Sequence, residues 1–121
     1  MILLPNLAVV IPCYNEEQRL NPVVFINELL KNPNLTFLFV NDGSRDNTLK
    51  VIQKICRHYP ERALYISLDK NSGKGEAVRR GMLHLLENDS YNIIGFWDAD
   101  LAVPLSELWD FVDVFRQNST V

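Results

Sequence analysis

The stretch LTFLFVNDGSRDN, residues 35–47, runs from a continuous apolar segment into a polar turn that contains a glycine. A β-favouring run without polar alternation is typical of a strand that is covered on both faces. Apolar residues then recur over 46–59 at the spacing of one helix face, and they are Val51, Ile52, Ile55, Cys56 and Tyr59. The stretch therefore predicts one strand–turn–helix unit of a layered α/β fold.

The same unit recurs four times along the chain. The expected strands are 7–13, 35–42, 63–68 and 92–98, and helical spacing follows each of them. Strands that alternate with helices imply a parallel sheet with right-handed crossovers. We therefore expect an α/β fold with a four-stranded, mostly parallel sheet flanked by helices.

The first and last expected helices have recognisable starts and apolar faces. The first begins with Asn21 as its N-cap and Pro22 as its first residue. Its apolar face is expected to be Val23, Ile26, Leu29 and Leu30. The last begins at Pro104 or Ser106 and carries Leu108, Phe111, Val112 and Phe115. If part of that last face is left uncovered, a homodimer through the second half of the chain is expected.

Composition narrows the class of protein. The chain has 121 residues, of which 47% are hydrophobic and 22% charged, an ordinary mix for one compact domain. A net charge of -3 argues against nucleic acid as a partner. Cys13 and Cys56 lie in apolar runs, as buried reduced thiols of a cytoplasmic protein do. No apolar run reaches the ~18 residues of a membrane helix.

The polar segments follow the strands. They are CYNEE (13–17), NDGSRDN (41–47), DKNSGKGE (69–76) and DADLAVP (98–104). In open parallel sheets, ligands bind beyond the carboxyl ends of the strands. The sequence therefore predicts one crevice rich in Asp, Asn, Gly and Lys.

The segment DADLAVP gives the sharpest chemical signal. Asp98 and Asp100 are two residues apart, so in extended backbone both side chains would point to one side. Two adjacent carboxylates repel each other unless a cation lies between them, and Mg²⁺ or Mn²⁺ takes such oxygen ligands together with phosphates. Ala99 is small enough for a ligand to approach the backbone. The alternative is a solvated turn after a strand.

The second segment places Asp42 at the end of its strand. A carboxylate there would accept a hydrogen bond from a base N–H, and either uracil or guanine offers one. Gly43 permits a tight turn, and Ser44 or Asp46 can cap the next helix. A plain capped turn explains all of these residues except Asp42.

The other two segments supply further candidates for nucleotide binding. Lys74 lies among glycines at a helix start, where backbone N–H groups can bind an anion; the alternative is a solvated lysine. In PCYNEE, Pro12 ends a strand, Tyr14 could stack on a base, and Glu16 or Glu17 could bind a ribose hydroxyl. The alternative there is an ordinary strand-to-helix loop.

Taken together, VVIPCYNEE, FVNDGSRDNT, NSGKGEAVRRGM and FWDADLAVP resemble family 2 glycosyltransferases in order and spacing. The resemblance covers nearly the whole chain and implies the Rossmann-like GT-A fold. The closest likeness is to dolichyl- or polyprenyl-phosphate sugar synthases. DADLAVP and AVRRGM favour the glucosyl branch with UDP-glucose, and GDP-mannose is the other candidate donor. One departure is Asn41, where the family usually has another Asp.

The resemblance also implies roles for individual residues. Asp42 would bind the base, Asp98 would lie near the ribose and the metal, and Asp100 would bind Mg²⁺ or Mn²⁺. The implied reaction is inverting transfer of glucose or mannose, with Asp98 and Asp100 as the catalytic pair, to a lipid phosphate or a sugar. A receiver domain with a phosphorylated aspartate fits poorly, because such domains place an acidic pair after the first strand.

Family domains continue beyond the length of this chain. Residues 1–121 are therefore expected to be the nucleotide-sugar-binding part, truncated before the acceptor-binding part. The alternative function is a nucleotide-binding module without turnover. Any association with the cytoplasmic face of a membrane would come through segments outside these residues.

Overall fold

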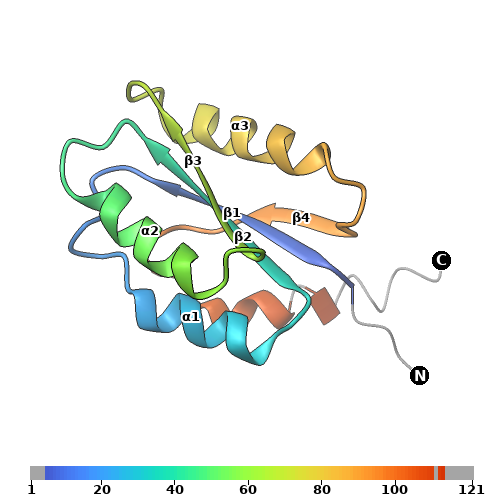
Figure 1. Ribbon diagram of the computed structural model, residues 1–121. Coiled ribbons are helices and arrows are strands. Elements are labelled where there is room, and N and C mark those ends of the chain that lie inside the picture. The colour runs from blue at the N-terminus through green and yellow to red at the C-terminus, as the bar shows by residue number, and fades with distance from the viewer. Residues whose placement is uncertain (1–4, 111, 114–121) are drawn as a thin grey trace.

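The computed structural model describes residues 5–110, 112 and 113, and they form a parallel sheet with helices on both faces (Figure 1). The strand order in this part of the chain is β3-β2-β1-β4. The strands are β1 (Leu7–Cys13), β2 (Leu35–Asp42), β3 (Ala63–Leu68) and β4 (Ile93–Phe96). The helices are α1 (Pro22–Lys31), α2 (Thr48–His58), α3 (Lys74–Leu86) and the short 3₁₀ helix η1 (Leu105–Glu107). The predicted α/β class is confirmed.

The two central strands, β1 and β2, hold the core together. They pair in parallel from Leu7 opposite Leu35 to Cys13 opposite Asn41, and both are almost fully buried. Alternate residues of β1 face opposite layers. Leu7, Val9 and Ile11 share a core cluster with residues of α1 and α2, whereas Ala8 and Val10 share one with residues of α3. Burial on both faces explains why these strands are continuous apolar runs. The fourth strand is shorter than the predicted 92–98.

Helix α1 begins as predicted, but its buried face is different. The Asn21 side chain accepts a hydrogen bond from the Val23 N–H at 3.1 Å. Phe25, not Val23, is the anchor: its ring meets those of Phe37 and Phe39 edge-on, with centroids 5.2 and 5.3 Å away. Val23 is 63% exposed and Leu30 is 66% exposed. Leu29 is fully buried and Ile26 packs against the core, as predicted, so the prediction was wrong for Val23 and Leu30 only. Several apolar stripes fit one short helix, and the aromatic side chain buries the most area.

The predicted last helix is only partly described. Pro104 precedes η1, and helical residues follow at 108–110 and 112–113. Leu108 and Val112 are buried in the core beneath α1 and do not form an exposed patch. Phe111 and Phe115 lie outside the described residues. Within the described part of the chain, no helix has the length and apolar content needed to span a membrane.

Close packing of α3 on the sheet leads to a first prediction, which concerns Gly81. A Cβ at this position would lie 2.6 Å from Val10 Cγ1 and 3.1 Å from Val40 Cγ2. Overpacking costs about 1–3 kcal/mol, and alanine recovers roughly 1 kcal/mol of helix propensity. Gly81→Ala should therefore lower the free energy of unfolding by about 1 kcal/mol, measured by urea denaturation.

Gly75→Ala is the matched control in the same helix, because a Cβ there has no neighbour within 4 Å. It should be neutral or slightly stabilising. Equal free energies of unfolding for the two variants would contradict the packing argument.

Candidate functional site

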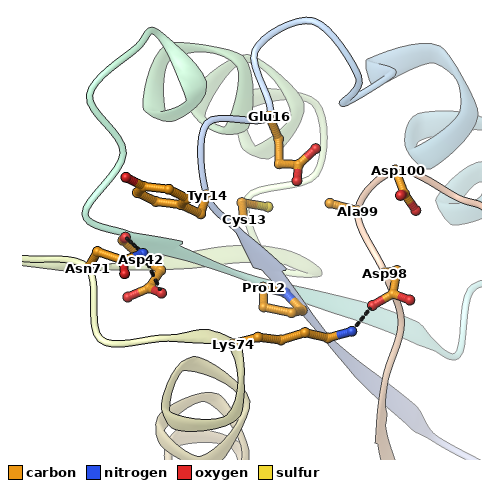
Figure 2. A pocket seen from close by; sticks show the side chains of 10 residues that line it. All are labelled: Pro12, Cys13, Tyr14, Glu16, Asp42, Asn71, Lys74, Asp98, Ala99 and Asp100. Atoms are coloured by element: carbon orange, nitrogen blue, oxygen red, sulfur yellow. Dashed lines mark hydrogen bonds and ion pairs between the residues drawn. The ribbon is translucent and has the colours of Figure 1, made fainter.

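A pocket of about 350 Å³ lies at the carboxyl ends of the strands (Figure 2). Ten residues from the strand ends and the segments that follow them line it: Pro12, Cys13, Tyr14, Glu16, Asp42, Asn71, Lys74, Asp98, Ala99 and Asp100. The site residues predicted from the sequence are among them, except Gly43 and Glu17, the alternative to Glu16 as a ribose ligand. Cys13 and Asn71 were not predicted, although both lie in the polar segments that the sequence singles out. The volume is within the usual range for small-molecule sites.

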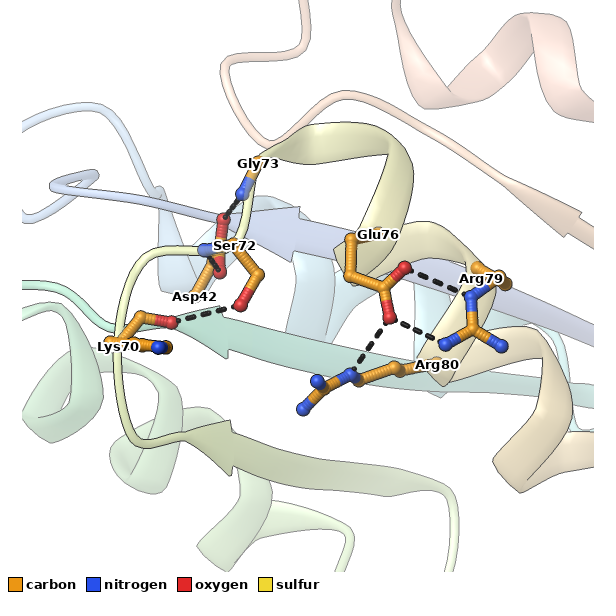
Figure 3. A network of polar contacts seen from close by, with 7 residues as sticks. All are labelled: Asp42, Lys70, Ser72, Gly73, Glu76, Arg79 and Arg80. Carbon is orange, nitrogen blue, oxygen red and sulfur yellow. Dashed lines mark hydrogen bonds and ion pairs between the residues drawn. The ribbon is translucent and has the colours of Figure 1, made fainter.

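Asp42 is the most buried polar residue of the pocket, at 2% exposure. One carboxylate oxygen accepts the Ser72 N–H at 2.7 Å. The other accepts the Gly73 N–H at 3.0 Å (Figure 3) and the Asn71 amide at 3.1 Å (Figure 2). A carboxylate has about four acceptor positions, so one remains for a ligand. Asp42 therefore fixes the loop that precedes α3, a structural role that the sequence pattern does not predict.

Gly43 is explained by close packing between loops. Its φ is +66°, and a Cβ would lie 2.3 Å from Asn71 N and 2.4 Å from the Lys70 carbonyl carbon. Glycine alone allows the loop after β2 to approach the loop after β3 this closely. The residue does not line the pocket, so a direct contact of Gly43 with nucleotide stays a prediction.

The loop after β1 is held by the turn before α2. The Glu16 N–H donates to Thr48 Oγ1 at 2.8 Å, and the Asn15 N–H donates to Ser44 Oγ at 3.0 Å. Asn15 has a positive φ of 52°. These bonds present the Tyr14 ring, 40% exposed, beside the pocket.

Asp98 and Asp100 share the pocket, but not for the predicted reason. Strand β4 ends at Phe96, and the two aspartates lie in a turn closed by the Leu101 N–H and the Asp98 carbonyl at 3.1 Å. Leu101 has φ +56°. The Asp100 carboxylate accepts the Ala102 N–H at 3.0 Å. The assumption of extended backbone was wrong, because the strand ends earlier; the turn brings both carboxylates to the pocket.

Lys74, the first residue of α3, reaches across the pocket to Asp98. Its ammonium forms an ion pair with Asp98 Oδ1 (Figure 2). The same nitrogen lies 5.7 Å from the centroid of the Phe96 ring. Lysine and aspartate thus connect opposite walls of the pocket, the start of α3 and the turn after β4.

The part of the pocket around Glu16 is acidic. Glu16 forms an ion pair with Arg19, Nε to Oε2, at 2.9 Å. Burial raises the pKa of Glu16; Arg19 lowers it, and the charge of Asp100 raises it. Burial, with the charge of Glu16, also raises the pKa of the Cys13 thiol, which stays protonated. The effect of Asp100 on Glu16 means that a cation beside Asp100 would relieve repulsion across the pocket.

The carboxylate pair fits a hard divalent cation. Asp98 and Asp100 offer oxygen ligands, and Mg²⁺ is typically held by one or two carboxylates plus phosphates and waters. Lys74 is already drawn to Asp98, as expected where a cation is favoured. Among residues 5–110, 112 and 113, no three His, Cys, Asp or Glu residues cluster as metal ligands. Waters, or the phosphates of a ligand, would therefore supply the remaining coordination positions.

Comparison with solved structures identifies the class of fold. A mannosyltransferase from Pyrobaculum calidifontis, solved in complex with GDP-Man and Mn²⁺, superposes with a TM-score of 0.62 at 24% identity. The match covers 87% of this chain and 30% of that one. The fold is therefore that of the GT-A glycosyltransferases, as the sequence predicted.

Sequence comparison then identifies the family. The profile of glycosyl transferase family 2 matches residues 8–121, and the chain belongs to this family of enzymes. The dolichyl-phosphate beta-glucosyltransferase of Saccharomyces cerevisiae is 34% identical over 123 residues, covering 94% of this chain and 35% of that protein. The Drosophila melanogaster protein of the same name is 38% identical over 118 residues, covering 85% and 36%. The chain thus spans about a third of the length of these relatives.

Proposed function

We propose that this chain forms the donor-binding part of an inverting glycosyltransferase that moves a hexose from a UDP- or GDP-sugar to a polyprenyl or dolichyl phosphate. UDP-glucose is the favoured donor. The observation that carries the proposal is the single pocket in which Asp42, Lys74, Asp98 and Asp100 converge. The names of the relatives, dolichyl-phosphate beta-glucosyltransferases, support glucose and the lipid-phosphate acceptor.

The pocket has groups suited to the base and to the diphosphate of a nucleotide-sugar. Its inner end holds the buried Asp42, with one acceptor position left for a base N–H, and the exposed Tyr14 ring lies near it (Figure 2). Its outer end holds Asp98, Asp100 and the Lys74 ammonium. A base at the inner end would therefore place the diphosphate beside the lysine and the carboxylate pair.

In this arrangement the chain's own groups bind and orient the donor. Lys74 offers a positive charge to the leaving diphosphate, on which negative charge develops as the bond to the anomeric carbon breaks. Asp98 and Asp100 would hold Mg²⁺ or Mn²⁺, which supplies Lewis-acid stabilisation of that charge. The presence of Mn²⁺ beside GDP-Man in the P. calidifontis mannosyltransferase complex supports such a metal.

An acceptor lipid phosphate is already ionised near neutral pH and needs no general base to attack from the opposite face. A sugar hydroxyl would need one. Placement at the cytoplasmic face of a membrane, through parts outside these residues, belongs to the same proposal. The alternative is a nucleotide-binding module without turnover, and an assay for glucose transfer from UDP-glucose to polyprenyl phosphate distinguishes the two.

The proposal predicts that UDP or GDP stabilises the protein only when Mg²⁺ or Mn²⁺ is present. Without a cation, the paired carboxylates repel the diphosphate. Nucleotide at a hundred times its dissociation constant should add about 2.7 kcal/mol to the free energy of unfolding. Thermal-shift measurements with UDP and GDP, each with Mn²⁺ or with EDTA, provide the test.

Asp100→Asn is the matched control, since it keeps the shape of the side chain and removes one metal-binding charge. It should abolish most of the Mn²⁺-dependent shift. Equal shifts of the wild-type protein with Mn²⁺ and with EDTA would count against the metal assignment. The absence of any shift would count against the proposed function itself.

A further inference from the structure

The pocket contains an internal cation where the proposed metal would bind. Of the ten residues that line it in the described part of the chain, Lys74 is the one with a positive charge, and its ammonium is paired with Asp98. Asp98 is also one of the two carboxylates that fit a divalent cation. Lys74 and a metal ion therefore have the same partner, and like charges held on one carboxylate repel each other.

The backbone of Lys74 is fixed while its side chain is free to move. The two preceding N–H groups, of Ser72 and Gly73, donate to the buried Asp42 carboxylate. Beyond this anchored backbone, the lysine side chain is 58% exposed and the Asp98 side chain 48%. A lysine has a flexible four-carbon stem and three donors that can rotate. Changing its partner requires rotation of that stem and no movement of α3.

The alternative partner lies within the same pocket. Asp42 and Tyr14 mark the end proposed for the base, and Lys74 stands between that end and the carboxylate pair (Figure 2). A diphosphate bound there would carry several negative charges directly beside the lysine. It would replace the single charge of Asp98 as the partner of Lys74.

We propose that Lys74 is an exchangeable counter-ion, which neutralises Asp98 in the nucleotide-free protein and moves to the diphosphate when nucleotide and metal bind together. This inference rests on the proposed function, because it needs a nucleoside diphosphate as ligand. Lys74 thereby couples the binding of the two ligands. Bound nucleotide draws Lys74 away from Asp98, where it competes with the metal. Bound metal displaces Lys74 from Asp98, which leaves the lysine able to pair with the diphosphate. Such coupling acts equally in both directions.

The proposed exchange predicts that one substitution, Lys74→Met, strengthens the binding of Mn²⁺ alone and weakens the binding of UDP. Lys74→Met should bind Mn²⁺ alone about two- to fivefold more tightly than the wild type, the range expected for loss of an exposed ion pair. With saturating Mn²⁺, the same variant should bind UDP about tenfold more weakly, because a charge-assisted contact to phosphate is lost. Mn²⁺ binding can be followed by electron paramagnetic resonance, and UDP binding by calorimetry.

Lys70→Met is the matched control. Lys70 is an exposed lysine in the loop that precedes α3, and it does not line the pocket. Its variant has the same net charge as Lys74→Met. It should leave both affinities unchanged. Melting curves of the two variants should be alike, because neither lysine is buried.

The outcomes separate this inference from the proposed function. If the wild type binds UDP with Mn²⁺ but Lys74→Met binds Mn²⁺ alone no more tightly, the exchange is wrong and the function stands. If both lysine variants tighten Mn²⁺ binding equally, net charge explains the effect and the exchange is again wrong. If the wild type binds neither UDP nor GDP under any condition, the proposed function fails, and the exchange fails with it.

Discussion

Asp42→Ala is expected to lower the free energy of unfolding by about 3 kcal/mol and to weaken nucleotide binding at least about tenfold. The buried carboxylate accepts three hydrogen bonds from the 71–73 segment. Removing it leaves those donors without their charged partner, and hydrogen bonds to charged groups contribute about 1.5–3 kcal/mol each. Water entering from the open pocket would recover part of this loss. Urea denaturation measures the first effect, and calorimetry with UDP and Mn²⁺ the second.

Binding of pyrophosphate with Mn²⁺ shows which role of Asp42 dominates. If Asp42 only contacts the base, pyrophosphate binding should be unchanged in Asp42→Ala. Because the carboxylate also anchors the backbone before Lys74, we expect pyrophosphate to bind more weakly too, though by less than UDP. Asp69→Ala is the control: it removes an exposed carboxylate at the end of the neighbouring strand and should change neither stability nor binding. Wild-type stability in Asp42→Ala would contradict the anchoring role.

Gly43→Ala is expected to destabilise the protein by about 4 kcal/mol. Left-handed backbone costs an L-residue about 1–2 kcal/mol, and overpacking adds about 1–3 kcal/mol. Here the new methyl group would meet the backbone of Lys70 and Asn71, at 2.4 and 2.3 Å, and not a side chain that could rotate away. The loop after β3 must therefore shift, which would also disturb the Asp42 contacts. Urea denaturation and UDP calorimetry should both report the change.

Gly73→Ala separates strain from collision. Gly73 also has a positive φ, +95°, but a Cβ there has no neighbour within 4 Å. With φ +95° and ψ 155° it lies in a region that only glycine occupies readily, so Gly73→Ala gives an upper limit of about 1–3 kcal/mol for the backbone strain alone. A larger loss in Gly43→Ala would come from the contact between the loops. If Gly43→Ala lowers the free energy of unfolding no more than Gly73→Ala does, the argument that the close approach of the loops adds to the cost is contradicted.

The sequence by itself determined the sheet and the position of the pocket. Mostly apolar, β-favouring runs at 7–13, 35–42 and 63–68 predicted three strands with their observed bounds. Alternation with helices implied the parallel topology, and parallel strands end at the same edge. These features depend on local spacing and composition, which a sequence displays directly. Where several apolar stripes competed within one helix, as in α1, spacing alone placed Leu29 and Ile26 correctly but missed Phe25 and wrongly included Val23 and Leu30.

Only the tertiary structure decided what the polar residues contact. The partners of Asp42 are about 30 residues away in the chain, and Lys74 meets Asp98 across 24 residues. The same holds for Gly43, whose need for glycine comes from the 70–71 backbone. Such contacts depend on the path of each loop, and the early end of β4 shows that loop paths do not follow from local pattern. Polar side chains at a crevice can be placed by topology, but their partners are set by the distances at which separate loops finally pack.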